Sequence, residues 1–183
     1  VLPPGQYYAV ASRGTEYELA YSEEFTVGKS THSKLELMVE HTVDTSGWIS
    51  ADFHVHAVPS PDSGVSLADR VTTFVAEGVE FMASSDPDAI TNYEPVIEEL
   101  NLESWLSSTP GTEVTTIELG HFLGFPLAWD PLADRGGALD WTGLNPQEII
   151  DGVRDLGEPN ITDPVVFVAH PRDGMLGYLD QYG

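Results

Sequence analysis

The sequence predicts an α/β fold preceded by a short all-β segment. The first 47 residues hold several short runs of strand-forming residues separated by glycines, a pattern typical of small β-sheets. From Trp48 onward, apolar strand-like runs alternate with amphipathic helix-like stretches joined by short loops. Such alternation indicates a mostly parallel sheet or a barrel. We therefore expect a β-sandwich-like accessory segment over residues 1–47 and one α/β domain over 48–183.

The all-β segment is predicted from its short runs and the turns between them. Strands are expected at 6–12, 16–20, 23–27 and 34–40, with Gly5, Gly14 and Gly28 at turns. In the last run, apolar and mostly polar residues alternate, so one face should be buried. The opening residues, Pro3 to Tyr8, resemble the last part of a carboxypeptidase-regulatory-like or prealbumin-like β-sandwich. We expect an accessory role for this segment rather than a catalytic one.

The α/β domain is predicted to begin with a strand, a helix and a second strand. The first strand covers residues 49–55. Ser66 should cap the helix that follows, because the apolar residues after it recur at helical spacing, and Gly78 should close that helix. The second strand is expected at 79–84.

The same alternation continues to the end of the sequence. A second helix is expected through 96–105. Asn145 should cap a further helix that has Pro146 at its first position. The remaining strands are expected at 111–115, 121–125 and 165–169.

The most informative stretch is Asp52-Phe53-His54-Val55-His56. Side chains two apart in a strand point to the same side, so His54 and His56 should present two imidazoles on one face. Two imidazoles at the carboxyl end of a strand form half of a divalent-metal site. Further candidate ligands lie near the ends of other predicted elements: Asp62, Asp86, Glu113, His121 and His170. Because the chain has no cysteine, nitrogen and oxygen atoms must hold any metal, which suits zinc, manganese or iron.

Each of these residues also has an ordinary structural explanation. A His-x-His pair occurs by chance at polar strand edges. Asp62 could form an Asx-turn, Asp86 could cap a turn, and Glu113 could be a solvated strand residue. The remaining histidines, His32 and His41, are expected to be surface residues.

The strong negative charge limits the partners. With 30 acidic residues against seven Lys and Arg, the formal charge is −23, which argues against nucleic acid or an anionic membrane as the main partner. Such a surface suits a salty or extracellular medium, or is simply that of an acidic protein. No long apolar run or N-terminal targeting segment is present. The opening at Val1, without Met, indicates the middle of a longer polypeptide, and we expect a secreted or periplasmic rather than a cytoplasmic location.

Several motifs also occur in the order and form of a known family. They are Asp52 to His56 with Ser60-Pro61-Asp62, then Gly78 to Asp86, Gly111 to Thr115, Gly120-His121-Phe122, and Ala169-His170-Pro171. Together they resemble the successive motifs of the PHP domain, the family named for polymerase and histidinol phosphatase. The Gly-His-Phe and His-Pro-Arg forms, with a β-module in front, most resemble the CehA/McbA-type metallohydrolases. The resemblance covers roughly residues 48–183.

The resemblance implies a partial, irregular βα (TIM-like) barrel with two or three divalent metal ions, Zn, Mn or Fe, at its mouth. It also implies the activity of a phosphoesterase or another hydrolase. The positions that match the family's metal ligands are His54, His56, Asp62, Glu113, His121 and His170. Asp86 matches the acidic half of the second motif, as a ligand or a catalytic residue. Arg172 follows the last motif as an anion or substrate contact, or equally as a surface ion-pair residue.

Two departures from the family pattern bear on activity. The second motif normally reads Asp-His, but here it is Asp86-Pro87, and Pro87 has neither a ligating atom nor a backbone N–H. One metal position should therefore lose a ligand unless Asp86, Asp88 or water replaces it. The family's closing Asp-x-His motif is also expected only after Gly183.

The sequence thus favours a metal-dependent hydrolase that uses a metal-activated water on an ester, carbamate or phosphoester of a small molecule. The alternative is a catalytically impaired metal- or ligand-binding module, because of Pro87. A third hypothesis is an acidic surface that binds only calcium. The sequence predicts neither the substrate nor the oligomeric state.

Overall fold

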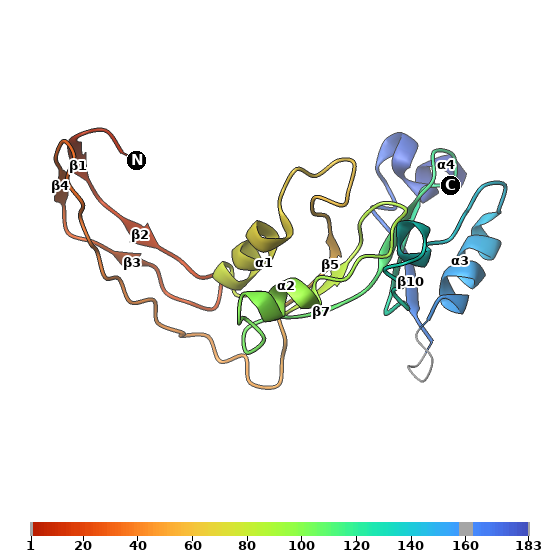
Figure 1. The fold of residues 1–183 in the computed structure, drawn as a ribbon, viewed down its shortest axis with the longest axis horizontal. Coiled ribbons are helices and arrows are strands. Elements are labelled where there is room, and N and C mark those ends of the chain that lie inside the picture. The colour runs from red at the N-terminus through yellow and green to blue at the C-terminus, as the bar shows by residue number, and fades with distance from the viewer. Residues whose placement is uncertain (1, 158–162, 183) are drawn as a thin grey trace.

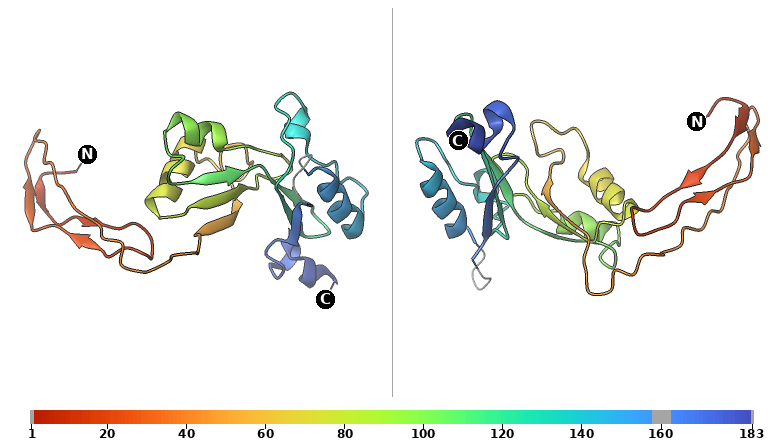
Figure 2. Two further views of the ribbon diagram at one scale, coloured as in Figure 1. Left: turned by 90° about the horizontal axis from the view of Figure 1, so that it is seen from below. Right: turned by 180° about the vertical axis from the view of Figure 1, so that it is seen from behind.

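The computed structural model describes residues 2–157 and 163–182 as a molecule with an N-terminal ribbon and a two-sheet body. Figure 1 shows the ribbon projecting away from the body, so the two ends of the chain lie far apart. Figure 2 shows from two other sides that the outer part of the ribbon stands clear of both sheets, whereas at its base Arg13 lies over the Trp105 ring. None of the described helices is long and apolar enough to cross a membrane.

The ribbon is a long antiparallel hairpin with two short ladders. At its tip β1 (Gly5–Tyr7) pairs with β4 (Phe25–Val27), and nearer the body β2 (Val10–Ala11) pairs with β3 (Ala20–Tyr21). One face of the ribbon is exposed, including 70% of Tyr8 and 68% of Tyr21, and no residue on the other face is fully buried. The expected sandwich-like packing is therefore absent from the described part of this segment.

The strand expected at 34–40 does not form. The neighbouring His41 makes a single bridge with Tyr17, but no ladder includes residues 34–40. Leu35 is 41% and Met38 88% exposed. The alternation of apolar and polar residues was a misleading signal here, because it stabilises a strand only when a partner strand and a covered face are present.

The first sheet of the body is parallel and confirms the strand–helix alternation locally. Its strands are β5 (Ala51–Val55), β6 (Phe81–Ser84) and β7 (Ser107–Thr109), in that order. Helix α1 (Leu67–Ala76) connects the first two strands and α2 (Glu94–Glu99) precedes the third. The expected cap is present, since Ser66 accepts a hydrogen bond from the Asp69 backbone N–H. A first core forms among the residues Val55, Val71, Met82, Tyr93, Ile97 and Leu106.

The second sheet is antiparallel. Its order is β10 (Val165–Val168), β9 (His121–Phe125) and β8 (Thr112–Thr115). Helix α3 (Pro146–Asp155) packs against it and starts at Asn145, the predicted cap, where the structure also has a capping box with Glu148. A second core lies between this sheet and α3, made by Ile90, Val114, Phe122, Leu127, Ile149 and Val153.

Several short elements were not predicted. Strand β7, the 3-10 turns η1 (Asp134–Gly137) and η2 (Gly174–Leu176), and helix α4 (Tyr178–Tyr182) carry little periodicity because each spans at most five residues. The helix expected through 96–105 starts two residues earlier and ends at Glu99. Element types were thus predicted better than their boundaries.

The prediction of a partial TIM-like barrel is wrong. The described residues form two separate three-stranded sheets and no closed barrel. The reason lies between Thr115 and His121: residues 116–120 make a tight hairpin, with Gly120 at φ +74°, instead of a helical crossover. A parallel neighbour needs a crossover of a dozen or more residues, so β9 returns antiparallel beside β8.

The two sheets meet at Gly111, directly before β8. Its backbone N–H donates to the Ser84 hydroxyl at 3.1 Å. A Cβ atom at this position would lie 2.5 Å from the Ser84 carbonyl oxygen and 2.7 Å from that of Gly124. Phe53 of β5 stacks on Phe125 of β9 across the same junction, with ring centroids 5.2 Å apart. Close contact between the sheets therefore requires glycine at position 111.

We predict that Gly111→Ala lowers the free energy of unfolding by about 1–3 kcal/mol, because backbone oxygens of both sheets must move apart. Urea unfolding measures the change. Gly64→Ala is the matched control, since a Cβ atom there meets nothing within 4 Å. Equal stability of the two variants would contradict the close packing at the junction.

Candidate metal centre

Five of the predicted ligand residues converge where the two sheets meet. His54 is in β5 and His56 directly follows it, Glu113 is in β8, His121 begins β9, and His170 follows β10. The placement of His121 at the start of its strand follows from the antiparallel sheet, because the amino end of β9 lies beside the carboxyl ends of β8 and β10. The cluster thus combines side chains from both sheets.

The Glu113 carboxylate is the centre of the cluster. Its side chain is only 3% exposed, and its Oε1 lies 3.2 Å from His54 Nε2, 3.1 Å from His121 Nδ1 and 3.3 Å from His170 Nε2. Its Oε2 lies 3.5 Å from His56 Nε2. The Nε2 atoms of His54 and His56 are themselves 3.1 Å apart. One carboxylate is therefore surrounded by four imidazoles.

These side chains form two groups whose donor atoms lie close enough together to hold a metal ion. One group is His54, His56 and Glu113, the other is Glu113, His121 and His170, and within each the ligand atoms lie within 4.8 Å of one another. Buried His121 Nε2 and His170 Nδ1 have no hydrogen-bond partner among the described residues. Orphaned buried nitrogens are rare unless a further ligand satisfies them. The cluster could therefore bind a metal, and its nitrogen and oxygen donors fit one.

Electrostatics keep Glu113 charged. Burial by itself favours the neutral acid, but hydrogen bonds and charges from His121 and His54 outweigh it and hold the pKa of Glu113 well below its usual range. The hydrogen bond with Glu113 in turn raises the pKa of His54, against the opposing effect of burial. Glu113 is thus a buried anion that requires positive charge around it.

Asp62 lies beside the cluster and contacts it through His56. The Nδ1 atom of His56 lies 3.0 Å and 3.2 Å from the two carboxylate oxygens of Asp62. A carboxylate at one ring nitrogen fixes the tautomer and points the other nitrogen at the metal position. In this arrangement Asp62 orients His56, whose Nε2 faces Glu113.

Asp86 lies outside the cluster. It is fully buried, and its carboxylate accepts hydrogen bonds from Ala57 N and Ser60 Oγ, both at 2.9 Å, from Thr91 Oγ1, and from the Tyr93 hydroxyl at 2.8 Å. Burial, with the nearby Asp86 charge, raises the pKa of Tyr93 and keeps its hydroxyl a donor. Asp86 therefore ties the loop after β5 to the segment after β6.

Arg172 is the other predicted site residue outside the cluster. Its side chain is 71% exposed and lies 3.5 Å from Asp180. This arrangement matches the surface ion-pair alternative for Arg172.

The series of hydrogen bonds that holds Glu113 was not predicted from the sequence. Thr115 Oγ1 donates to Glu113 Oε2 at 3.0 Å, and the Thr115 backbone N–H donates to Asp88 Oδ1 at 3.0 Å. The indole N–H of Trp141 donates to the same Asp88 oxygen at 2.8 Å. Thr115 is two residues after Glu113 in one strand, so their position on the same face could have predicted this contact from the sequence. The contact of Asp88 with Trp141 joins distant parts of the chain, and no sequence pattern predicts it.

His170 adopts an unusual backbone conformation. Its φ is +25°, a region that residues with a side chain rarely occupy. Such strain persists only where surrounding contacts hold it, and it concentrates at functional sites. In this protein, the residue with the strained backbone is the one whose Nε2 lies next to Glu113.

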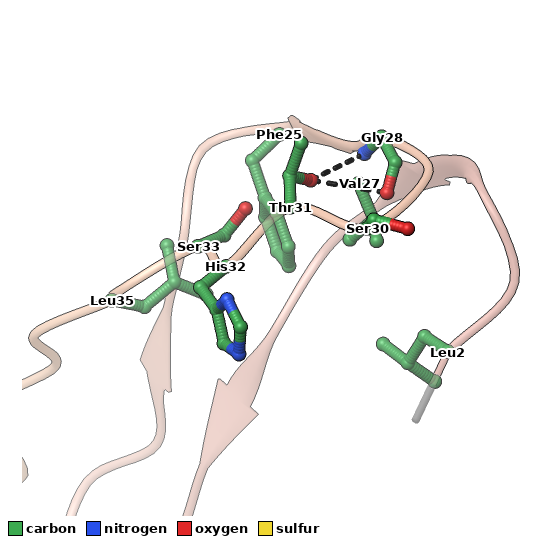
Figure 3. A pocket seen from close by; sticks show the side chains of 9 residues that line it. All are labelled: Leu2, Phe25, Val27, Gly28, Ser30, Thr31, His32, Ser33 and Leu35. Carbon is green, nitrogen blue, oxygen red and sulfur yellow. Dashed lines mark hydrogen bonds between the residues drawn. The ribbon is translucent and has the colours of Figure 1, made fainter.

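Two surface hollows differ in their relation to the cluster. One of about 570 Å³ lies at the ribbon tip, near Phe25 and Leu35, and contains none of the candidate ligands (Figure 3). Another of about 380 Å³ is lined by Asp52, His54, Val55, His56, Arg70 and Phe74. Only the second gives access to the candidate metal centre.

Comparisons with known proteins identify no relative: no family model, no curated protein and no solved structure matches this chain. The PHP resemblance therefore stays a prediction.

We predict that Asp86→Asn lowers the free energy of unfolding by about 1–3 kcal/mol, because an amide nitrogen would face buried donors, yet leaves metal binding intact. Urea unfolding and the metal content of the folded protein measure both effects. Asp134→Asn is the control, since that side chain is 96% exposed. Loss of metal without loss of stability would identify Asp86 as a ligand instead.

Proposed function

We propose that this protein is a metal-dependent hydrolase of the PHP superfamily, similar to the CehA/McbA type, acting on a small-molecule ester, carbamate or phosphoester. The observation that carries the proposal is the buried Glu113 carboxylate with four imidazoles around it. Imidazole and carboxylate together are a donor set for catalytic divalent metals.

Glu113 with His54 and His56 would hold one of two proposed ions, and Glu113 with His121 and His170 would hold the other. The support is the division of the cluster into two groups, His54 with His56 and His121 with His170, each completed by the same carboxylate. These donors favour zinc, manganese or iron. Calcium requires six to eight oxygen ligands, so a cluster rich in imidazoles gives no support to the calcium-only hypothesis.

The protein residues have distinct roles in this proposal. The Glu113 charge offsets part of the charge of the cations, Asp62 keeps Nε2 of His56 free to bind, and Thr115 fixes one Glu113 oxygen. When bound, divalent ions supply Lewis acidity, which polarises a substrate oxygen and acidifies water.

The nearby hydroxyl groups support water as the nucleophile. Ser60 donates its hydroxyl hydrogen to Asp86, and Ser85 donates to the Val55 carbonyl, so both buried serines are committed to structural hydrogen bonds. The chain also has no cysteine. A covalent route through Ser or Cys finds no support at this site.

One observation favours a second candidate, a catalytically impaired metal- or ligand-binding module. The second motif provides no free ligand, because Pro87 has no ligating atom and both oxygens of Asp86 accept hydrogen bonds from the protein. A site that lacks one ligand can hold metal without turning over substrate.

The test replaces the paired histidines. We expect His54→Ala and His56→Ala each to lower metal affinity and hydrolysis of a panel of phosphate and carboxylate esters by at least about tenfold. His32→Ala, in the ribbon tip away from the cluster, should match the wild type in both assays. Unchanged metal content and turnover in the His54 and His56 variants would refute the proposal.

A Pro87→His variant separates the two candidates. Higher metal occupancy and faster turnover than wild type indicate a hydrolase whose site lacks one ligand. Full metal occupancy without turnover in either protein indicates the binding module.

A further inference from the structure

The hollow beside the cluster contains one basic residue. Arg70 of α1 lines it together with the candidate ligands His54 and His56. A substrate that reaches the proposed metal ions through this hollow therefore passes a guanidinium group. In a chain with 30 acids and seven Lys and Arg, a cation at this position is informative about the substrate.

The Arg70 side chain is held in place by the protein. Its Nε donates to the His56 carbonyl oxygen at 2.9 Å, and its guanidinium carbon lies 5.8 Å from the centre of the Phe74 ring. These contacts hold the guanidinium group beside His56, whose ring is a proposed metal ligand. An arginine with restricted freedom loses less entropy when it binds a ligand.

The remaining donors of Arg70 are uncommitted. Within residues 2–157 and 163–182, its terminal nitrogens form no hydrogen bond and no ion pair with a carboxylate. The three other arginines of the body each have an aspartate nearby: Arg135 at 3.6 Å, Arg154 at 3.9 Å and Arg172 at 3.5 Å. Arg70 thus lacks an acidic partner despite the excess of acids.

Asp52 also lines the hollow and acts against an anion there. Its Oδ1 accepts a hydrogen bond from the His54 backbone N–H at 3.0 Å, which uses part of its capacity. Because Asp52 and the negative charge of the whole protein repel anions, an anion can bind in this hollow only with help from a cation such as Arg70. The planar fork of an arginine is suited to two oxygens of one oxyanion.

We propose that Arg70 binds an oxyanion of the substrate, a phosphoryl or carboxylate group, in the hollow beside His54 and His56. This inference rests on the proposed function and narrows the substrate to negatively charged small molecules. The terminal N–H groups of Arg70 donate to the oxyanion while Nε keeps its bond to His56.

The test is calorimetric titration of the full chain, loaded with metal, at constant pH and ionic strength. Inorganic phosphate and acetate are the two probes, and they distinguish a phosphoryl from a carboxylate preference. We expect Arg70→Gln to weaken binding of the preferred probe about tenfold, and Arg70→Lys to weaken it less because the charge remains. Arg154→Gln has the same change of charge on α3 and should match the wild type.

Three results would overturn the assignment of Arg70. The first is equal anion affinity of the Arg70→Gln and Arg154→Gln variants, and the second is weaker anion binding in Arg172→Gln but not in Arg70→Gln. The third is an equal loss of anion binding and of bound metal in both Arg70 variants, which indicates that the bond of Arg70 to His56 is purely structural. Metal content, measured separately in each protein, reports on the proposed function. If the wild type holds no metal, that function fails, and the same titrations on metal-free protein still decide whether Arg70 binds the anion.

Discussion

The carboxylate of Glu113 is almost inaccessible to water, and a buried charge is tolerated only where neighbouring groups neutralise it and bond to it. Four imidazoles surround this carboxylate, and Thr115 holds one of its oxygens from the same strand. The strained backbone of His170 and the contact of Asp62 with His56 both accompany this arrangement. Bound cations would neutralise the Glu113 charge more fully than the imidazoles alone.

The junction between the sheets makes this arrangement possible. The parallel sheet contributes His54 and His56 at the end of β5, and the antiparallel sheet contributes the other three members of the cluster. Gly111 lets the backbones approach closely enough for these groups to touch, and Asp86 holds the loop that follows β5. Arg70 then reaches the same place from α1 through the His56 carbonyl. The proposed substrate and metal positions thus depend on contacts between segments far apart in the chain.

Local signals predicted more of the molecule than long-range ones. The caps at Ser66 and Asn145 and the two-residue spacing of His54 and His56 depend on neighbours in sequence, and the structure contains all three. The barrel was wrong because the periodicity of β8 and β9 does not encode how they pair, which the tight turn at 116–120 decides. The structural role of Asp86 could not be predicted either, because its four hydrogen-bond donors come from two different loops. Nothing in the sequence around Asp86 distinguishes a metal ligand from a carboxylate that only accepts structural hydrogen bonds.

In the proposed metal centre, the Glu113 carboxylate belongs to both metal positions. The most direct measurement is the number of divalent ions bound per chain, determined by elemental analysis of the folded wild type and of Glu113→Gln. Glu118→Gln is the control, since that residue lies exposed in the turn between β8 and β9. We expect two ions in the wild type and the control, and loss of both in Glu113→Gln because the shared ligand is weakened. A wild type without bound metal, or a Glu113→Gln variant that keeps its full number of ions, would contradict this expectation.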